Sequence, residues 1–338
     1  DWNYASLFAL IGGGSLLPEY QTTLSGNLNL ASEKGGIFVS TGSGQIQNFL
    51  LKRGNLVLSN NGPMELSAKN GVVNLTNFKL VGDKAKFEIL GKQFSSRNLD
   101  LQINLSSPLR LFQIFLPFLE EFSGLAYLEV NVSGSVEKPE IFGEARVEDG
   151  FVKLKSFPHP FEKIEGQAQF SQTNVSISNV KGQLAGGVFA GDGNIQIKGL
   201  RDLPVQIKAQ VQNINLNVPD HVRTSGNADI MVSGNWFPFI LSGIYRVNNG
   251  KIDKEFTSDR LGTSLRQSSY LPKVILQSAF EPIVLDMQVN LEKGVNIKNS
   301  LMEGVLKGNI QVKGVPNSPI LLGRITTEKS SKLFFRDT

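Results

Sequence analysis

The sequence predicts an elongated, almost all-β protein in which each strand carries one apolar face. Apolar and polar residues alternate with a period of two through most of the chain, as in 126–133 and 205–212. Because successive side chains of a strand point to opposite faces, each such strand is wet on one face and apolar on the other. Turns with Asn-Gly or Asp-Gly, as at 148–150 and 248–250, separate the stretches and supply the positive φ of tight hairpins.

Composition supports the same fold class. Only 19% of the 338 residues are charged, while 34 are glycine and 40% are hydrophobic. This balance favours strands and turns over helices. We expect roughly 20 strands of about 5–6 residues, mostly antiparallel to their neighbours.

One segment departs from the period of two. Ser107 and Pro108 are residues typical of a helix start, apolar residues follow at helical spacing, and Gly124 is a typical stop. Pro117 should kink such a helix. We therefore expect one short helix near 108–123, packed over an end of a sheet.

These patterns divide the chain into five segments. We expect an N-terminal β segment at 1–106, a short helix at 107–123, a repeat-containing β segment at 124–252, a polar loop or linker at 253–273 and an incomplete C-terminal β segment at 274–338. The chain begins at Asp1 without Met and ends within a strand pattern, so we interpret it as a fragment or processed chain.

A longer pattern recurs three times. It begins with the pairs Ser133-Gly134, Ser233-Gly234 and Lys313-Gly314, and a second glycine follows nine residues after the first, at Gly143, Gly243 and Gly323. An alternating strand precedes each copy, and a proline lies between the two glycines. The spacing predicts a repeated hairpin unit, and units with one unburied apolar face must stack or curl together.

Residues that carry chemistry are scarce. The chain has no cysteine and two histidines, His159 and His221, at positions that offer no metal-ligand spacing. Its lysines and arginines are scattered among acidic residues, so nucleic-acid binding has little support. No stretch reaches the roughly 18–20 apolar residues of a membrane-spanning helix. We predict a protein that is not an enzyme and needs no cofactor or metal.

The repeats resemble a known family. "YLEVNVSGSVEKPEIFGEARVEDGFVKL" (127–154) and "FEKIEGQAQFSQTNVSISNVKGQLAGGVFAGDGNIQI" (161–197) are similar to the TamB family, a translocation and assembly module subunit of the AsmA-like group. The tail "GVLKGNIQVKGVPNSPILLGRI" (304–325) is similar to the C-terminal domain of that family. The resemblance covers roughly 99–338 and rests on glycine and hydrophobic spacings.

The resemblance implies a long, mostly antiparallel sheet curled into an open half-pipe (a β-taco) with an apolar lumen. It implies a location in the periplasm of a Gram-negative bacterium, anchored to the inner membrane by a segment outside this chain. It also implies two partners: phospholipid, and an outer-membrane barrel of the Omp85 family, similar to TamA.

We therefore expect a bridge-like protein that binds phospholipid and conducts it between inner and outer membranes along a hydrophobic groove. The candidate lining residues are apolar members of the alternating strands: Leu128, Val130, Val132, Ile195, Ile197, Val205, Ile207, Val211, Ile230, Val232, Met287, Val289, Ile310 and Val312.

Two alternatives stay open. An unpaired sheet edge can pair with a client strand, which would make the protein an assembly factor for outer-membrane β-barrel proteins acting with the Omp85-family partner. A closed β-sandwich or solenoid with a dry core, serving as an adhesin or carbohydrate-active protein, also alternates with a period of two.

Overall fold

The structure is a computed structural model, and it describes part of the chain. The described residues are 20–32, 40–82, 84–91, 94–95, 97–116, 118–135, 137–198, 202–219, 221–235, 238–253, 282–291, 293–316 and 318–334. Apart from residue 253, the predicted polar loop at 253–273 lies outside them, and so do the first residues of the segment predicted at 274–338.

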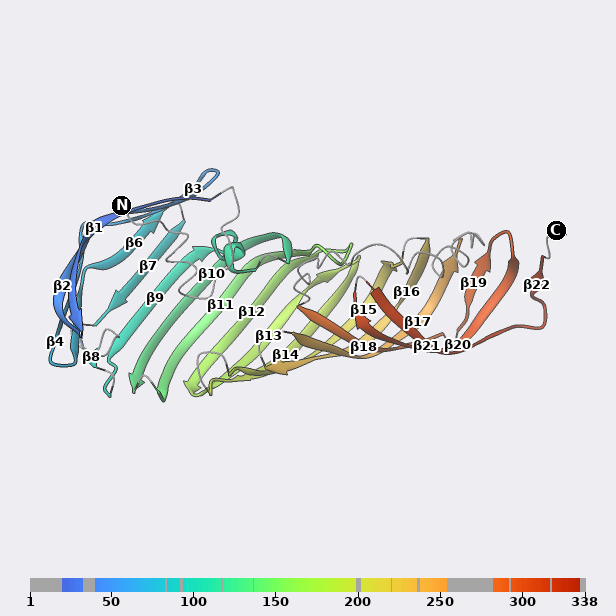
Figure 1. The fold of residues 1–338 in the computed structure, drawn as a ribbon. Coiled ribbons are helices and arrows are strands. Elements are labelled where there is room, and N and C mark those ends of the chain that lie inside the picture. The colour runs from blue at the N-terminus through green and yellow to red at the C-terminus, as the bar shows by residue number, and fades with distance from the viewer. Residues whose placement is uncertain are drawn as a thin grey trace, which may run out of the picture. The chain divides into compact units, whose positions relative to one another are not determined.

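The fold-class prediction is confirmed, because the described residues form almost only strands and almost all pairs are antiparallel (Figure 1). The first strands are β1 (Tyr20–Ser32), β2 (Ser40–Arg53), β3 (Leu56–Asn60), β4 (Met64–Lys69), β5 (Val72–Thr76), β6 (Phe78–Gly82), β7 (Ala85–Leu90), β8 (Phe94–Ser95) and β9 (Leu101–Pro108). Next come β10 (Leu119–Gly134), β11 (Pro139–Leu154), β12 (Phe161–Gln172), β13 (Asn174–Leu184), β14 (Gly187–Gln196) and β15 (Pro204–Asn217). The last are β16 (Val222–Asn235), β17 (Phe239–Ile252), β18 (Ile283–Asn290), β19 (Val295–Lys298), β20 (Met302–Val315), β21 (Ser318–Thr327) and β22 (Lys332–Leu333).

Contacts divide the chain into two units. Unit 1 comprises 1–153, 162–181 and 192–205, and unit 2 comprises 154–161, 182–191 and 206–338. The division follows contacts in space and cuts through strands such as β13 and β14, so it does not test the five predicted sequence segments. Those segments stay predictions.

Unit 1 contains a single antiparallel sheet. β7 pairs with β9, and β9 pairs with β10. β11 follows, since Gly143 on β11 lies against Glu129 and Val130 on β10. Figure 1 shows β7, β9, β10, β11 and β12 side by side in this order. At the other end β1 and β2 pair over their whole lengths.

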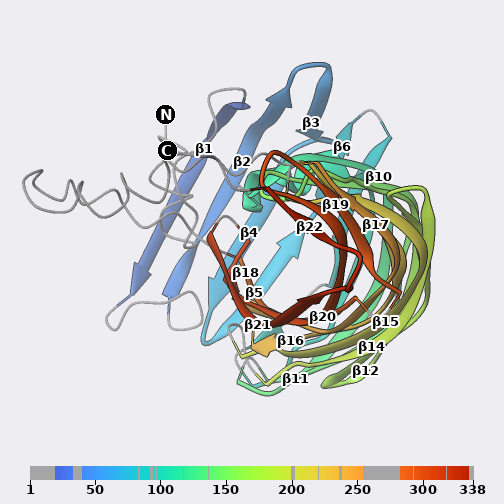
Figure 2. The same cartoon turned by 90° about the vertical axis from the view of Figure 1, so that its right-hand side faces the viewer.

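Unit 2 contains one curled sheet in which β17 runs parallel to both β18 and β19. β16 and β17 form a long antiparallel pair, whereas β17 and β18 run parallel. β20 then pairs antiparallel with β18, β19 and β21. In Figure 2 the strands β15 to β17 and β20 bow around a common centre. The sheet does not close, because β21 pairs with β20 and with no other described strand.

The expected helix near 108–123 is much shorter than predicted. A 3-10 helix, η2, covers only Leu109–Phe115, with Pro108 rather than Ser107 at its N-cap position; the Ser107 hydroxyl donates to the Pro108 carbonyl oxygen at 3.2 Å. β10 already begins at Leu119. The apolar positions in this segment satisfy both periods, and Pro117 has no backbone N–H with which to extend a helix. Instead, the end of this segment joins the sheet, where Gly124 of β10 lies against Asp149 and Gly150 of β11.

The strands are also longer than predicted, reaching 16 residues in β10 and β11. They run through positions that look like turns in the sequence, such as Asp149-Gly150 in β11. Asp149 has a positive φ of 48° inside the strand. The β16–β17 pair likewise shifts register between Ser225 and Gly226. Irregularities of this kind bend a strand without ending it, so a long strand can follow a curled sheet.

The predicted repeat is a repeated hairpin, formed by β10–β11, β16–β17 and β20–β21. The second glycine of each copy has φ between 132° and 153°. In each copy a Cβ on that glycine would overlap a carbonyl oxygen of the partner strand, that of Glu129, Asp229 or Asn309. Glycine is required there because the partner backbone occupies the space of a side chain.

Among the described residues, no helical segment has the length and apolar character required to span a bilayer.

Candidate apolar groove

In unit 2, strand register gathers apolar side chains on one face of four strands. Ile230 on β16 faces Gly243 on β17, which faces Met287 on β18, which faces Val312 on β20. The side chains of register partners lie on the same face of a sheet. Along each strand, the next side chain on that face is two residues away. The next row is therefore on this face too: Ala228, Tyr245, Val289 and Ile310. We call these two rows the unit 2 apolar face.

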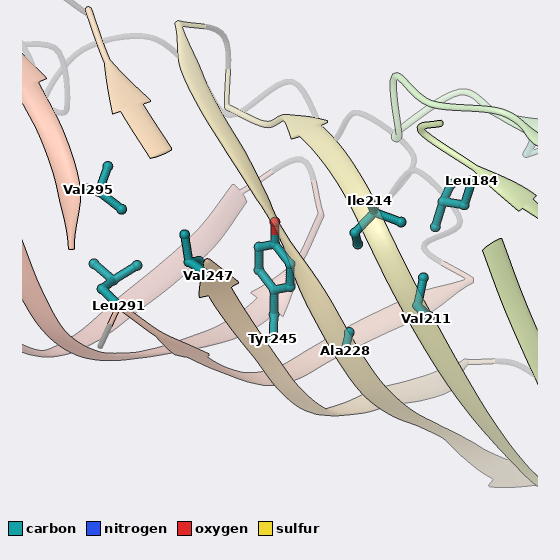
Figure 3. Packing of buried hydrophobic residues seen from close by; sticks show 8 residues of the cluster. All are labelled: Leu184, Val211, Ile214, Ala228, Tyr245, Val247, Leu291 and Val295. Carbon is teal, nitrogen blue, oxygen red and sulfur yellow. The ribbon is translucent and has the colours of Figure 1, made fainter. Parts of the chain in front are cut away.

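Part of this face is packed into a core (Figure 3). Ala228 and Tyr245 are the residues of the two rows that belong to this core. The whole core cluster comes from β13, β15, β16 and β17, with two more residues from 291–295: Leu184, Val211, Ile214, Ala228, Tyr245, Val247, Leu291 and Val295. Ile230, Met287, Val289 and Ile310 pack against them and stay partly exposed. The core therefore forms the support of the face, and the partly exposed side chains are the ones that a guest molecule could contact.

Unit 1 repeats the arrangement. Leu128, Val130 and Val132 on β10 face Leu105, Ile103 and Leu101 on β9. Leu105 and Ile103 in turn face Phe87 and Ile89 on β7. Of the three β10 residues only Val130 is buried, with 4% of its surface exposed. We call this set the unit 1 apolar face.

The predicted lining residues divide accordingly. Leu128, Val130 and Val132 come together in unit 1, and Ile230, Met287, Val289, Ile310 and Val312 share one face in unit 2. Val232 lies on that face, two residues beyond Ile230. Val211 is buried in the core, with 3% exposed, and so cannot line a groove in this state.

The other predicted residues lie on β14, just after it, or on β15. Ile195, Ile197 and Val205 belong to unit 1 and Ile207 to unit 2, and all four are partly buried. Whether any of the fourteen residues contacts a lipid stays a prediction.

Sequence reasoning missed the β17 part of the face. The segment 239–247 has apolar residues at both odd and even positions, so alternation alone does not tell which set points inward. The register shows that Leu241, Tyr245 and Val247 share the face of Ile230. The repeat offered a signal that could have identified the inward set. Gly243 corresponds to Gly143 of the first copy, so the odd-numbered residues of β17 could have been assigned to one face together with Gly243.

The opposite face of unit 2 is polar. Arg246 pairs with Asp229 at 2.6 Å, and both side chains are about half exposed. On the next strands, Gln311 donates a hydrogen bond to Asp286 at 2.9 Å. β18 and β20 thus separate an apolar from a polar face, as the alternation predicted.

Tyr245 is the one polar group within the unit 2 core cluster. Its hydroxyl donates a hydrogen bond to Thr224 Oγ1 at 3.0 Å. Burial raises the pKa of the Tyr245 hydroxyl above its ordinary value of 10.0, and the side-chain hydrogen bond with Thr224 partly opposes this change. The Tyr245 hydroxyl therefore stays protonated, and its hydrogen bond to Thr224 provides the partner that a polar group needs when it is buried beside apolar side chains.

The histidines occupy structural positions. His159 Nε2 accepts a hydrogen bond from the backbone N–H of Asn217 at 2.9 Å, and its ring lies edge-on to Phe157 at 5.6 Å. His221 Nδ1 lies 3.6 Å from Asp253. Within the described part of the chain no group of His, Asp and Glu side chains is placed to hold a metal ion.

Residues 178–338 match the family model described as the TamB C-terminal domain. No curated protein and no solved structure matches the chain.

Proposed function

We propose, on the premise that residues 178–338 belong to the TamB C-terminal domain family, that this protein binds phospholipid acyl chains along its apolar sheet faces and conducts phospholipid between inner and outer membranes. The family match supports a role in the TamB and AsmA-like cell-envelope system, a transport and assembly module that acts with an outer-membrane partner. The periplasmic location, the inner-membrane anchor and the Omp85-family partner similar to TamA are part of the proposal.

One observation carries the lipid proposal. The side chains of Ile230, Met287 and Ile310 share a face and are only partly buried. A dry core would bury them fully. Each acyl methylene that is removed from water against such a face contributes about 0.8 kcal/mol. An acyl chain that lies along several strands would therefore be held by many weak contacts and would not need a single high-affinity site.

Site-specific photocrosslinking tests the proposal. A photoreactive residue at Met287 faces the apolar side, and one at Gln288 on the same strand faces the polar side. In the full chain expressed in a Gram-negative host, we expect phospholipid adducts at position 287 and few at 288. The two positions are neighbours on one strand of the same protein, so they differ mainly in the face to which the side chain points. Equal labelling at both positions would therefore contradict the proposal.

A second function is favoured by the edge strand β21. All ten of its residues are exposed, with Leu321 at 63% and Ile320 at 57%. A long, exposed apolar edge invites pairing with another strand unless a partner covers it. This supports the proposal of an assembly factor for outer-membrane β-barrel proteins, in which β21 would pair with a client strand.

Crosslinking distinguishes the two functions. Cysteines placed in β21, at Leu322 and Arg324, would form disulfides with cysteine-bearing nascent outer-membrane strands if β21 is a docking edge. Crosslinks to protein at β21 without lipid adducts at position 287 would favour assembly. The reverse outcome would favour lipid transfer.

The third alternative, a closed sandwich or solenoid, receives no support. A sandwich requires two sheets packed face to face. In each unit the described strands pair within a single sheet, as the β7–β9–β10 and β16–β17–β18–β20 series show.

A further inference from the structure

Basic side chains gather at one end of the β16–β17 pair in unit 2. Arg223, near the start of β16, is the cross-strand neighbour of Lys251, near the end of β17. One step further along, the backbone N–H of Asp253 donates to the carbonyl oxygen of His221 at 3.1 Å. We call His221, Arg223, Lys251 and Asp253 the rim cluster, because they lie where one of these strands begins and the other ends.

A single carboxylate attracts all the bases of the rim cluster. Arg223 Nη2 and Lys251 Nζ lie 3.7 and 3.6 Å from Asp253 Oδ2. His221 Nδ1 lies 3.6 Å from Asp253 Oδ1. These separations are too long for hydrogen bonds. Asp253 therefore holds the bases near one another by charge, while their N–H groups stay available as donors.

The rim cluster keeps an excess of positive charge. Two permanent cations, Arg223 and Lys251, face one carboxylate, so one positive charge is left over even when His221 is neutral. Lys298 lies on the same side of the neighbouring strand β19 and has its own partner, because its Nζ is 3.6 Å from Glu303. The charge of the rim cluster therefore favours an anionic ligand.

The two cations are accessible to such a ligand. The side chains of Arg223 and Lys251 are 67% and 58% exposed, whereas that of Asp253 is 27% exposed. An approaching molecule therefore meets the cations before it meets the acid. A phosphate group presents oxygens in more than one plane, so it can accept from the planar guanidinium fork of Arg223 and from the ammonium group of Lys251 together.

The same strand ends carry apolar side chains on the other face. Val222 is the cross-strand neighbour of Ile252, and Ile252 faces Ile297 on β19. Ile252 packs against the core cluster that supports the unit 2 apolar face. Because side chains alternate, Arg223 and Lys251 start from the opposite face, and at a strand end their long side chains can reach round the edge of the sheet. A molecule with acyl chains on the apolar side and an anionic group at the rim would contact both.

We propose that the rim cluster binds the phosphate group of a phospholipid, with Arg223 and Lys251 donating hydrogen bonds to phosphate oxygens and Asp253 positioning both bases. The inference rests on the proposed lipid function, because it makes a lipid phosphate and not free phosphate the ligand. The headgroup would be held at the edge of the sheet while the acyl chains lie along the apolar side.

Calorimetric titration of the full chain with dihexanoylphosphatidylglycerol, kept below the concentration at which it forms micelles, tests the proposal. Dihexanoylglycerol has the same acyl chains without phosphate, and inorganic phosphate has the anion without acyl chains. We expect the wild type to bind the phospholipid more tightly than either of these. Arg223→Gln should weaken phospholipid binding about tenfold, because it removes a charge-assisted contact, and should leave dihexanoylglycerol binding unchanged.

Arg246→Gln is the matched control. Arg246 is also exposed on the β16–β17 pair, and its replacement removes the same charge. It lies about 16 Å along β17 from Lys251, which is more than the Debye length at physiological salt. Phospholipid affinity should therefore change less than about twofold in this variant. Equal losses in Arg223→Gln and Arg246→Gln would overturn the proposal, since they would reflect net charge and not a site.

Lys251→Gln is the second test, and it decides if Arg223→Gln lowers Tm. Lys251 is 58% exposed, so its replacement spares the core. Undiminished phospholipid affinity in Lys251→Gln would contradict the assignment.

The three ligands separate this proposal from the lipid function on which it rests. Equal affinity of the wild type for phospholipid and dihexanoylglycerol would overturn the phosphate site and leave the lipid function standing. Binding of inorganic phosphate that is lost in Arg223→Gln, with no binding of either lipid, would contradict the lipid function and show a site for free phosphate instead.

Discussion

Gly143 on β11 lies so close to Val130 on β10 that a Cβ at Gly143 would be 2.7 Å from the Val130 Cα. The same relationship joins Gly243 to Ile230 and Gly323 to Ile310. In each repeat copy, a residue of an apolar face therefore has a glycine as its neighbour across the hairpin. The repeat found in the sequence is thus a repeated backbone approach, and it can be tested by substitution.

Gly143→Ala should lower the free energy of unfolding by about 2–4 kcal/mol. The new Cβ would overlap the Glu129 carbonyl oxygen, and alanine is strained at a φ of 142°. Urea denaturation measures the change. Gly54→Ala is the control, because Gly54 also has a positive φ but nothing lies within 4 Å of its added Cβ. The control should lose only about 1–2 kcal/mol, and equal losses would refute the steric explanation.

Met287→Glu should reduce the phospholipid that copurifies with the chain by about tenfold. The substitution places a carboxylate on the unit 2 apolar face and removes contact with roughly two acyl methylenes. Lipid extraction and mass spectrometry give the measurement. Gln288→Glu, on the polar face of the same strand, should leave the lipid content unchanged. Val130 is a poorer choice, because it is buried and a charge there would damage the fold.

Stability should fall as the pH rises above about 10, in part because of Tyr245. Its pKa in the folded protein is raised above 10.0. Below pH 10 the group is protonated in both states and contributes no pH dependence. Above the unfolded pKa the unfolded state loses the proton first, so alkaline pH favours unfolding.

The comparison with Tyr245→Phe isolates this effect. The variant should lose about 1 kcal/mol at pH 7, because the hydrogen bond to Thr224 is removed. Its stability should then fall less steeply than that of the wild type between pH 9 and pH 11, as measured by thermal unfolding. Parallel curves for the two proteins would show that Tyr245 does not titrate differently on folding.

The Arg246–Asp229 ion pair should contribute less than about 1 kcal/mol despite its 2.6 Å separation. Both side chains are about half exposed, so water screens the attraction. A double-mutant cycle with Arg246→Gln and Asp229→Asn, read by urea denaturation, measures the coupling. A coupling energy well above 1 kcal/mol would mean that the polar face is less hydrated than its exposure indicates.

Alternation and glycine spacing by themselves determined a large part of this protein. A period of two can be satisfied only by strands with one apolar face, so the all-β class and the polar–apolar division followed from residues such as 126–133. The spacing of Gly134 and Gly143, repeated twice more, predicted the hairpins because only glycine tolerates such a backbone approach. The sequence did not predict that η2 ends at Phe115, because the apolar positions of 109–122 fit a helix and a strand equally well.

Only the tertiary structure decided which strands are neighbours and which apolar residues come together. The period of two carries no information on register, so the parallel pairing of β17 with β18, and with it the row Ile230, Gly243, Met287 and Val312, could not be read from the sequence. Burial is likewise a property of the packed sheet. It made Val211 part of the core while Met287 stayed partly exposed, although both alternate in the same way along their strands.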